Sequence, residues 1–131
     1  MYALVAWNKR DSEGTEAAIK YILMGSVATA FELFGFSYLY GFAGHLTFPE
    51  ITSALQTNQA SPLIWISVLF IISGIGFKMT LFPFHLWAPD VYEGAPTPVT
   101  AILSVTSKSI AIAFLTVLVF GPLNAIHQEI V

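Results

Sequence analysis

Three long apolar stretches constrain the fold of this 131-residue chain most strongly. We expect helices over residues 17–40, 62–82 and 99–120, because each stretch reaches the roughly 20 residues that a helix needs to cross a bilayer. Only 10% of the residues are charged and 56% are hydrophobic, whereas soluble domains carry about 25% charged residues. A soluble fold of this size needs more polar surface than that. The sequence therefore predicts an all-α, polytopic membrane protein.

The composition also excludes several classes of function. The net charge is −3 with only five Lys or Arg residues, so the chain lacks the dense basic face that binds nucleic acid. No cysteine is present, which removes thiolate zinc sites, disulfides and cysteine nucleophiles. The sequence contains no Gly-rich phosphate loop and no Ser/His/Asp set. We therefore expect no nucleic-acid partner and no thiolate metal site on this chain.

The segments between the predicted spans are short, polar or broken. MYALVAW, residues 1–7, is apolar but short, and we expect it to be the end of a fourth helix. The piece FPEITSALQ in the loop 41–61 is amphipathic and predicts a short helix along the membrane interface. Residues 83–98, PFHLWAPDVYEGAPTP, contain four prolines, which have no N–H donor. The second span is therefore expected to break near Pro83.

Basic residues predict the orientation of the spans. The turn of residues 8–16 carries Lys9 and Arg10, whereas the loop 41–61 carries no Lys or Arg. By the positive-inside rule, the first turn then lies in the cytoplasm or its organellar equivalent. The broken segment, residues 83–98, would lie near the inner face.

Two lysines inside the predicted spans are the first candidates for function. Lys108 lies near the middle of the third span, where an ammonium group costs about 2.5–3.5 kcal/mol on insertion scales. Lys78 lies about one turn before the break at Pro83. A lysine between an apolar environment and a nearby carboxylate can bind and release a proton near neutral pH. We interpret both as proton carriers; the alternative for Lys78 is an anchor that reaches the inner headgroups.

The other charges in and near the spans leave alternatives open. Glu32, past the middle of the first span, is either the counter-ion of a lysine or a protonated structural residue. Lys20 is an interfacial anchor or pairs with Glu16 at i,i+4 spacing. His85 is expected to hydrogen-bond the broken backbone or to relay protons, and Asp90 to cap a short helix.

The broken segment, residues 83–98, also contains residues that could suggest a metal site. The spacing of His85, Asp90 and Glu93 matches no common set of metal ligands. Trp87 is interpreted as a residue of the interfacial aromatic belt. On the residues alone, the chain is a fragment of a polytopic transporter or of a proton-conducting subunit.

The run GFKMTLFPFHLWAPDVYEGAPTPVTAILSVTSK, residues 76–108, resembles the antiporter-like membrane subunits of respiratory complex I. These subunits form one superfamily with Mrp-type cation/proton antiporter subunits and membrane-bound hydrogenase subunits. The Asp-Val-Tyr of residues 90–92 is similar to the N-type branch, also called subunit 2. The run EAAIKYILMGSVATAFELFGFSYLYGFAG, residues 16–44, is similar to the same branch.

The resemblance implies a much longer protein of roughly fourteen helices that contains two inverted repeats. This chain would match the end of the fifth helix through the eighth. Lys78 would then be the channel lysine beside the break, and Lys108 the mid-membrane lysine that passes protons onward. Lys20 would match a lysine of the sixth helix near the same path. In the family the glutamate that pairs with the channel lysine lies on the fifth helix, and Glu32 has no expected counterpart.

For function, the resemblance implies a proton-translocating subunit of NADH-quinone oxidoreductase. The resemblance also implies that this chain binds no flavin, iron–sulfur cluster or nicotinamide cofactor, and we expect no metal on it. Other subunits move electrons from NADH to quinone, so the oxidoreductase activity belongs to the complex. The implied partners are the other membrane subunits and the lipid bilayer, in a bacterial inner membrane in preference to an organellar inner or thylakoid membrane. Two alternatives stay open. One is a Mrp-type antiporter or membrane hydrogenase subunit, and the other is a non-catalytic membrane scaffold.

Overall fold

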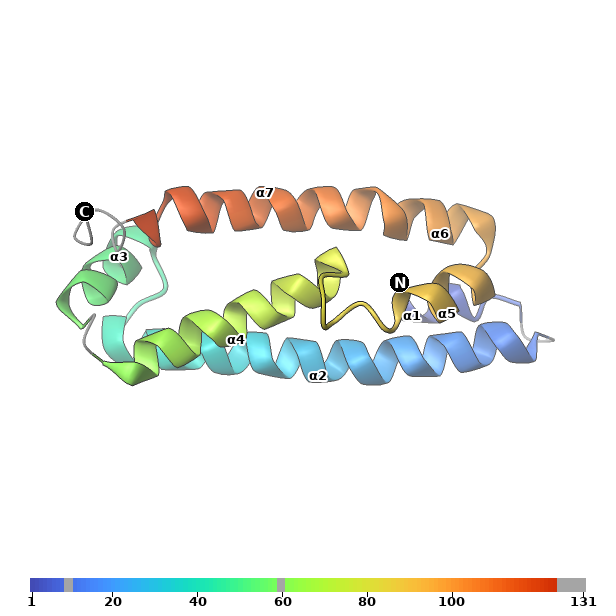
Figure 1. Ribbon diagram of the computed structural model, residues 1–131, viewed down its shortest axis with the longest axis horizontal. Coiled ribbons are helices and arrows are strands. Elements are labelled where there is room, and N and C mark those ends of the chain that lie inside the picture. The colour runs from blue at the N-terminus through green and yellow to red at the C-terminus, as the bar shows by residue number, and fades with distance from the viewer. Residues whose placement is uncertain (9–10, 59–60, 125–131) are drawn as a thin grey trace.

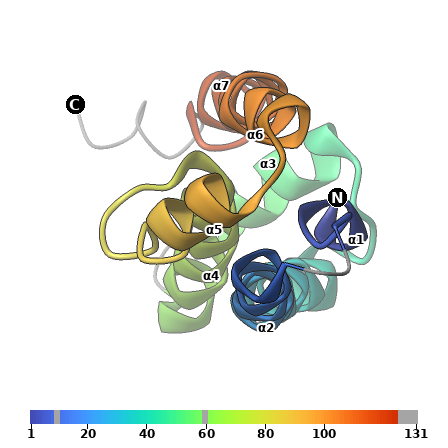
Figure 2. The same ribbon diagram turned by 90° about the vertical axis from the view of Figure 1, so that its right-hand side faces the viewer.

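A computed structural model describes residues 1–8, 11–58 and 61–124, and every regular element among them is a helix. Two long rods run along the molecule, one formed by α2 and the other by α6 and α7 end to end (Figure 1). Viewed along these rods, α4 and α5 lie on one side of α2 and α1 on the other (Figure 2). The helices are α1 (Tyr2–Val5), α2 (Ser12–Ala43), α3 (Phe48–Thr57), α4 (Pro62–Met79), α5 (Ala88–Gly94), α6 (Thr97–Ser104) and α7 (Thr106–Phe120).

Three helical segments are long and apolar enough to cross a membrane. They are Ser12–Ala43, Pro62–Met79 and Thr97–Phe120, the last interrupted by a turn at Val105. This confirms the all-α membrane fold with three spans and a break in the second. The turn residues Lys9 and Arg10, on which the predicted orientation depends, lie outside the described residues.

Helices α2 and α4 pack closely because glycines face their contact. A Cβ atom at Gly35 would lie 2.6 Å from the carbonyl oxygen of Ser67. A Cβ atom at Gly74 would lie 2.6 Å from Cβ of Glu32. Small residues permit such close approach in membrane helices, where dispersion contacts supply much of the attraction. The two helices therefore touch backbone to backbone along the middle of the bundle.

An apolar cluster closes the end of the bundle at α3. Ile51 and Leu55 of α3 are buried, with 5% and 1% of their surfaces exposed, against Leu39 of α2 and Leu118 of α7. The amphipathic piece of the long loop is thus a helix whose apolar face packs on the spans.

The second span ends at Met79, three residues before the end that the sequence predicts. Thr80 adopts a left-handed conformation with φ 56°, and its N–H donates to the carbonyl of Phe77 at 3.1 Å. The N–H of Leu81 donates to the carbonyl of Gly76 at 2.9 Å. This pair of bonds is typical of a Schellman motif, which ends a helix and satisfies its last carbonyls. The helix is therefore capped before the chain reaches Pro83.

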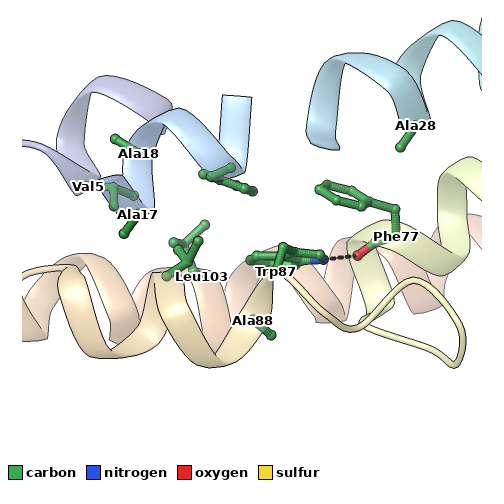
Figure 3. Packing of buried hydrophobic residues seen from close by; sticks show 10 residues of the cluster. Val5, Ala17, Ala18, Ala28, Phe77, Trp87, Ala88 and Leu103 are labelled. Atoms are coloured by element: carbon green, nitrogen blue, oxygen red, sulfur yellow. Dashed lines mark hydrogen bonds between the residues drawn. The ribbon is translucent and has the colours of Figure 1, made fainter. Parts of the chain in front are cut away.

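Helix α5 brings the chain back onto α2 and buries Trp87. The indole stacks on Tyr21 of α2 and on Phe77 of α4, with ring centroids 4.9 and 5.0 Å apart. Its Nε1 donates a hydrogen bond to the carbonyl of Phe77 at 3.1 Å (Figure 3). Only 3% of Trp87 is exposed. The interpretation of Trp87 as an interfacial belt residue is therefore wrong, because its ring fills the contact between three helices.

A methyl group at position 74 has no room at the α2–α4 contact. We predict that Gly74→Ala lowers the free energy of unfolding by about 1–3 kcal/mol, as overpacking does. The measurement is the melting temperature of the purified membrane protein in detergent. Gly41→Ala is the matched control, because a Cβ there meets no atom within 4 Å, and it should be neutral or stabilising by up to about 1 kcal/mol. Equal melting temperatures for the two variants would contradict the close contact.

Candidate functional site

Lys78 lies in the last turn of α4, opposite a carboxylate of α2. Its Nζ is 3.5 Å from Oε2 of Glu32, and the two side chains are 53% and 14% exposed. Gly74 is one turn earlier in α4 and permits the backbone approach that brings Glu32 to this place. Of the two readings of Glu32, the structure supports the counter-ion of a lysine. The ammonium group of Lys78 is paired across the helix contact.

A cavity of about 430 Å³ lies beside this ion pair. Its volume is far above the roughly 10–15 Å³ that one water molecule needs in a cavity. The cavity extends from the pair to the start of α7, where Ser107 immediately precedes Lys108. It is lined by Glu32, Ile75, Lys78, Ser107, Ile110, Ala111 and Phe114.

Lys108, in the first turn of α7, lies against an aromatic ring. Its Nζ is 5.6 Å from the centroid of the Tyr92 ring of α5. At this distance a cation is attracted to the face of the ring, which partly offsets the loss of hydration. The Tyr92 hydroxyl is buried and has no hydrogen-bond partner among the described residues. Lys108 is therefore half-buried beside a neutral partner.

Lys20 lies between two carboxylates. Its Nζ is 2.8 Å from Oε1 of Glu16 in the same helix and 2.7 Å from Oδ2 of Asp90 in α5. The pair with Glu16 has the i,i+4 spacing that the sequence shows. The pair with Asp90 is separated by 70 residues in the sequence, so no local pattern indicates it.

Asp90 does not cap α5. The residue before the first turn of this helix is Trp87, and no side chain there makes a capping hydrogen bond. Asp90 lies inside the first turn, with its carboxylate on Lys20. The expectation of a capping aspartate is therefore wrong, because the charge is used between helices.

His85 lies in the turn between α4 and α5. Its ring centroid is 5.8 Å from that of Phe82. Its Nδ1 is buried and has no hydrogen-bond partner within residues 1–8, 11–58 and 61–124. Nδ1 of His85 thus makes no bond to the broken backbone, and a proton relay through His85 stays a prediction. The described residues contain no group of three or more His, Asp or Glu side chains able to hold a metal.

Similarity to known proteins agrees with this arrangement of spans. The family described as NADH:quinone oxidoreductase/Mrp antiporter, transmembrane, matches residues 1–131. NADH-quinone oxidoreductase subunit N of Moorella thermoacetica is 47% identical over 125 residues, and that of Nitrosomonas europaea is 44% identical over 125 residues. Each match covers 95% of this chain and 26% of the relative. The chain thus spans about a quarter of the length of the curated relatives that it matches.

A solved structure shares the fold. It is a chain of the membrane-bound sulfane sulfur reductase, an archaeal respiratory membrane complex. The TM-score is 0.70 and the sequence identity is 32%, over 84% of this chain and 23% of that chain. The helical arrangement described above is therefore also found within a respiratory membrane protein of known structure.

The contact between Glu32 and Lys78 predicts energetic coupling. We expect Glu32→Gln and Lys78→Gln each to lower the free energy of unfolding, because either change leaves the other charge unpaired. The double variant should lose about 0.5–1 kcal/mol less than the sum of the single variants, as for partly exposed pairs in contact. The measurement is denaturant unfolding of the membrane protein in detergent micelles.

The control for this cycle uses an acidic residue that does not contact Lys78. Glu50 lies in α3 at the other end of the bundle and is hydrogen-bonded by the Thr47 hydroxyl. Glu50→Gln should therefore be additive with Lys78→Gln. Additivity in the Glu32 cycle as well would contradict the ion pair.

Proposed function

Because the chain belongs to the NADH:quinone oxidoreductase/Mrp antiporter transmembrane family, we propose that it is part of a proton-translocating membrane subunit of an NADH-quinone oxidoreductase. The names of the two subunit N relatives and the respiratory complex of the solved structure support this proposal. Electron transfer from NADH to quinone would belong to other subunits of the complex. The partners would be those subunits and the lipid of a bacterial inner membrane.

One observation carries the proposal. The Glu32–Lys78 ion pair lies inside the spans and borders a cavity that extends to the residue before Lys108. Glu32 and Lys78 both line this cavity, and so does Ser107, the neighbour of Lys108. Charged side chains inside a membrane are rare, and they mark ion pathways and proton relays in transporters. A scaffold helix has no need of two lysines placed in this way.

Movement of a carboxylate would drive the proton transfer. A carboxylate beside an amine stabilises the protonated amine, and its withdrawal favours release. In the described state the Glu32 carboxylate is beside the Lys78 ammonium. When this carboxylate moves away, the proton would leave Nζ of Lys78 for water in the cavity, and Nζ of Lys108 would accept it after passing its own proton onward. Electron transfer elsewhere in the complex needs only to shift the balance between two arrangements of the pair.

Lys20 and His85 belong to the same proposed path. Lys20 lies between Glu16 and Asp90 near the start of α2. His85 lies in the turn that follows α4, and its unpaired Nδ1 is available to a proton or a water molecule. His85 is therefore a candidate for proton exchange between the two lysines and the membrane surface. Lys20 would exchange a proton only after one of its two carboxylates moves away.

The test measures coupled turnover in the complete membrane complex. We expect Lys78→Ala or Lys108→Ala, or both, to lower NADH-driven proton uptake and quinone reduction by about tenfold or more, as loss of a proton-transfer group does. Assembly is followed by the amount of complex in the membrane. Thr116→Val is the control, because the Thr116 hydroxyl donates within α7 to the carbonyl of Ile112, and it should behave as the wild type.

The same experiment separates the alternatives. Normal coupled turnover in both lysine variants would overturn the proposal and favour a non-catalytic scaffold. The family description also includes Mrp antiporters. Sodium-dependent proton movement in reconstituted vesicles without NADH would therefore assign the chain to a cation/proton antiporter.

A further inference from the structure

We propose that Asp90 is a positioning residue, which anchors α5 to α2 through Lys20 and thereby sets the surroundings of Lys78 and Lys108. This inference rests on the proposed function, because it concerns the coupling of the same lysines. Its basis is the set of contacts that α5 makes with the rest of the chain.

The short helix α5 and the residue before it contact the surroundings of all three lysines. Asp90 Oδ2 is 2.7 Å from Nζ of Lys20. Trp87, just before the helix, donates to the carbonyl of Phe77, the residue that precedes Lys78. Tyr92, two residues after Asp90, lies beneath the ammonium group of Lys108. Since α5 has only seven residues, a shift of this helix would change the contacts at Lys20, at the Phe77 carbonyl and at Lys108 together.

Apolar packing holds α5 against α2. Val91 is fully buried, with 0% of its surface exposed. A Cβ at Gly94 would lie 2.8 Å from Cβ of Ala17, so the end of α5 touches α2 directly. The hydrophobic effect is non-directional, whereas an ion pair at 2.7 Å restricts both the rotation and the sliding of the helix. The Lys20–Asp90 pair is therefore a directional contact between α5 and α2, and together with the hydrogen bond from Trp87 to α4 it favours one position of α5.

An ion pair of this kind is stronger beside a membrane than in water. The two side chains are about half exposed on this chain, at 44% and 47%, and in water such a pair would contribute little. Lys20 belongs to a helix that is apolar enough to cross a membrane. The attraction between opposite charges rises as the surrounding dielectric constant falls.

Glu16 provides a matched control for Asp90. Both carboxylates contact the same ammonium group at nearly the same distance, 2.8 Å for Glu16 and 2.7 Å for Asp90. Glu16 lies on α2 with Lys20, so its pair does not join two helices. Removal of either charge changes the electrostatics of Lys20 similarly, but only removal of the Asp90 charge frees α5.

The experiment compares Asp90→Asn, Asp90→Glu and Glu16→Gln in the complete membrane complex. The readout is the number of protons taken up per NADH oxidised, measured in membrane vesicles with assembly confirmed. We expect Asp90→Asn to lower this ratio by about two- to thirtyfold, the range for residues that couple distant sites. Asp90→Glu keeps the charge and should restore at least about half of the wild-type ratio, and Glu16→Gln should leave the ratio unchanged.

Each outcome decides the proposal. Equal ratios for Asp90→Asn and Glu16→Gln would overturn it, and so would an Asp90→Glu variant as impaired as Asp90→Asn. If Asp90→Asn does not assemble, Lys20→Gln removes the same link from the α2 side, and a normal ratio in that variant overturns the proposal. Loss of pumping in Lys78→Ala with no difference between the Asp90 and Glu16 variants would refute this inference alone. Normal pumping in both lysine variants would refute the proposed function itself.

Discussion

The close contact between α2 and α4 is the constraint on which the rest of the structure depends. Two glycines, Gly35 and Gly74, bring the backbones together where any larger side chain would overlap. The same contact places Glu32 beside Lys78, so a charge inside one span is neutralised by the neighbouring span. It also determines where α4 ends relative to α2, and hence where the chain turns back. Packing without large side chains thus positions the polar groups of this membrane protein.

The break in the second span shows how the backbone is protected where the helix stops. A free carbonyl in a bilayer costs several kcal/mol, and the last carbonyls of α4 find donors in Thr80, Leu81 and Trp87. Thr80 adopts a left-handed conformation that is rare for a β-branched residue and costs roughly 1–2 kcal/mol. The Trp87 ring is buried at the contact of α2, α4 and α5, beside this capped end. The break is therefore a stable feature that combines a cap with aromatic packing.

The sequence predicts those features that depend on local patterns. Three apolar stretches indicate the spans, four prolines indicate the break, and charged residues in apolar stretches identify the three lysines. The partners of these lysines are not predictable in this way, because Lys20 and Asp90 are 70 residues apart and Glu32 meets Lys78 only through the packing of two helices. Asp90 directly after a proline resembles a helix cap, and the structure shows that tertiary contact overrides that local preference.

The broken segment provides partners both for a backbone carbonyl at the end of α4 and for lysine ammonium groups. A helix that stops inside a bilayer leaves carbonyl oxygens without donors, and lysines inside spans leave ammonium groups without acceptors. The segment from Trp87 to Tyr92 supplies an indole N–H to the carbonyl of Phe77, a carboxylate to Lys20 and an aromatic ring to Lys108. Because these groups lie on one short segment, a shift of the segment would change all three contacts together. The segment that follows the break thus contacts Lys20, Lys108 and the backbone carbonyl next to Lys78.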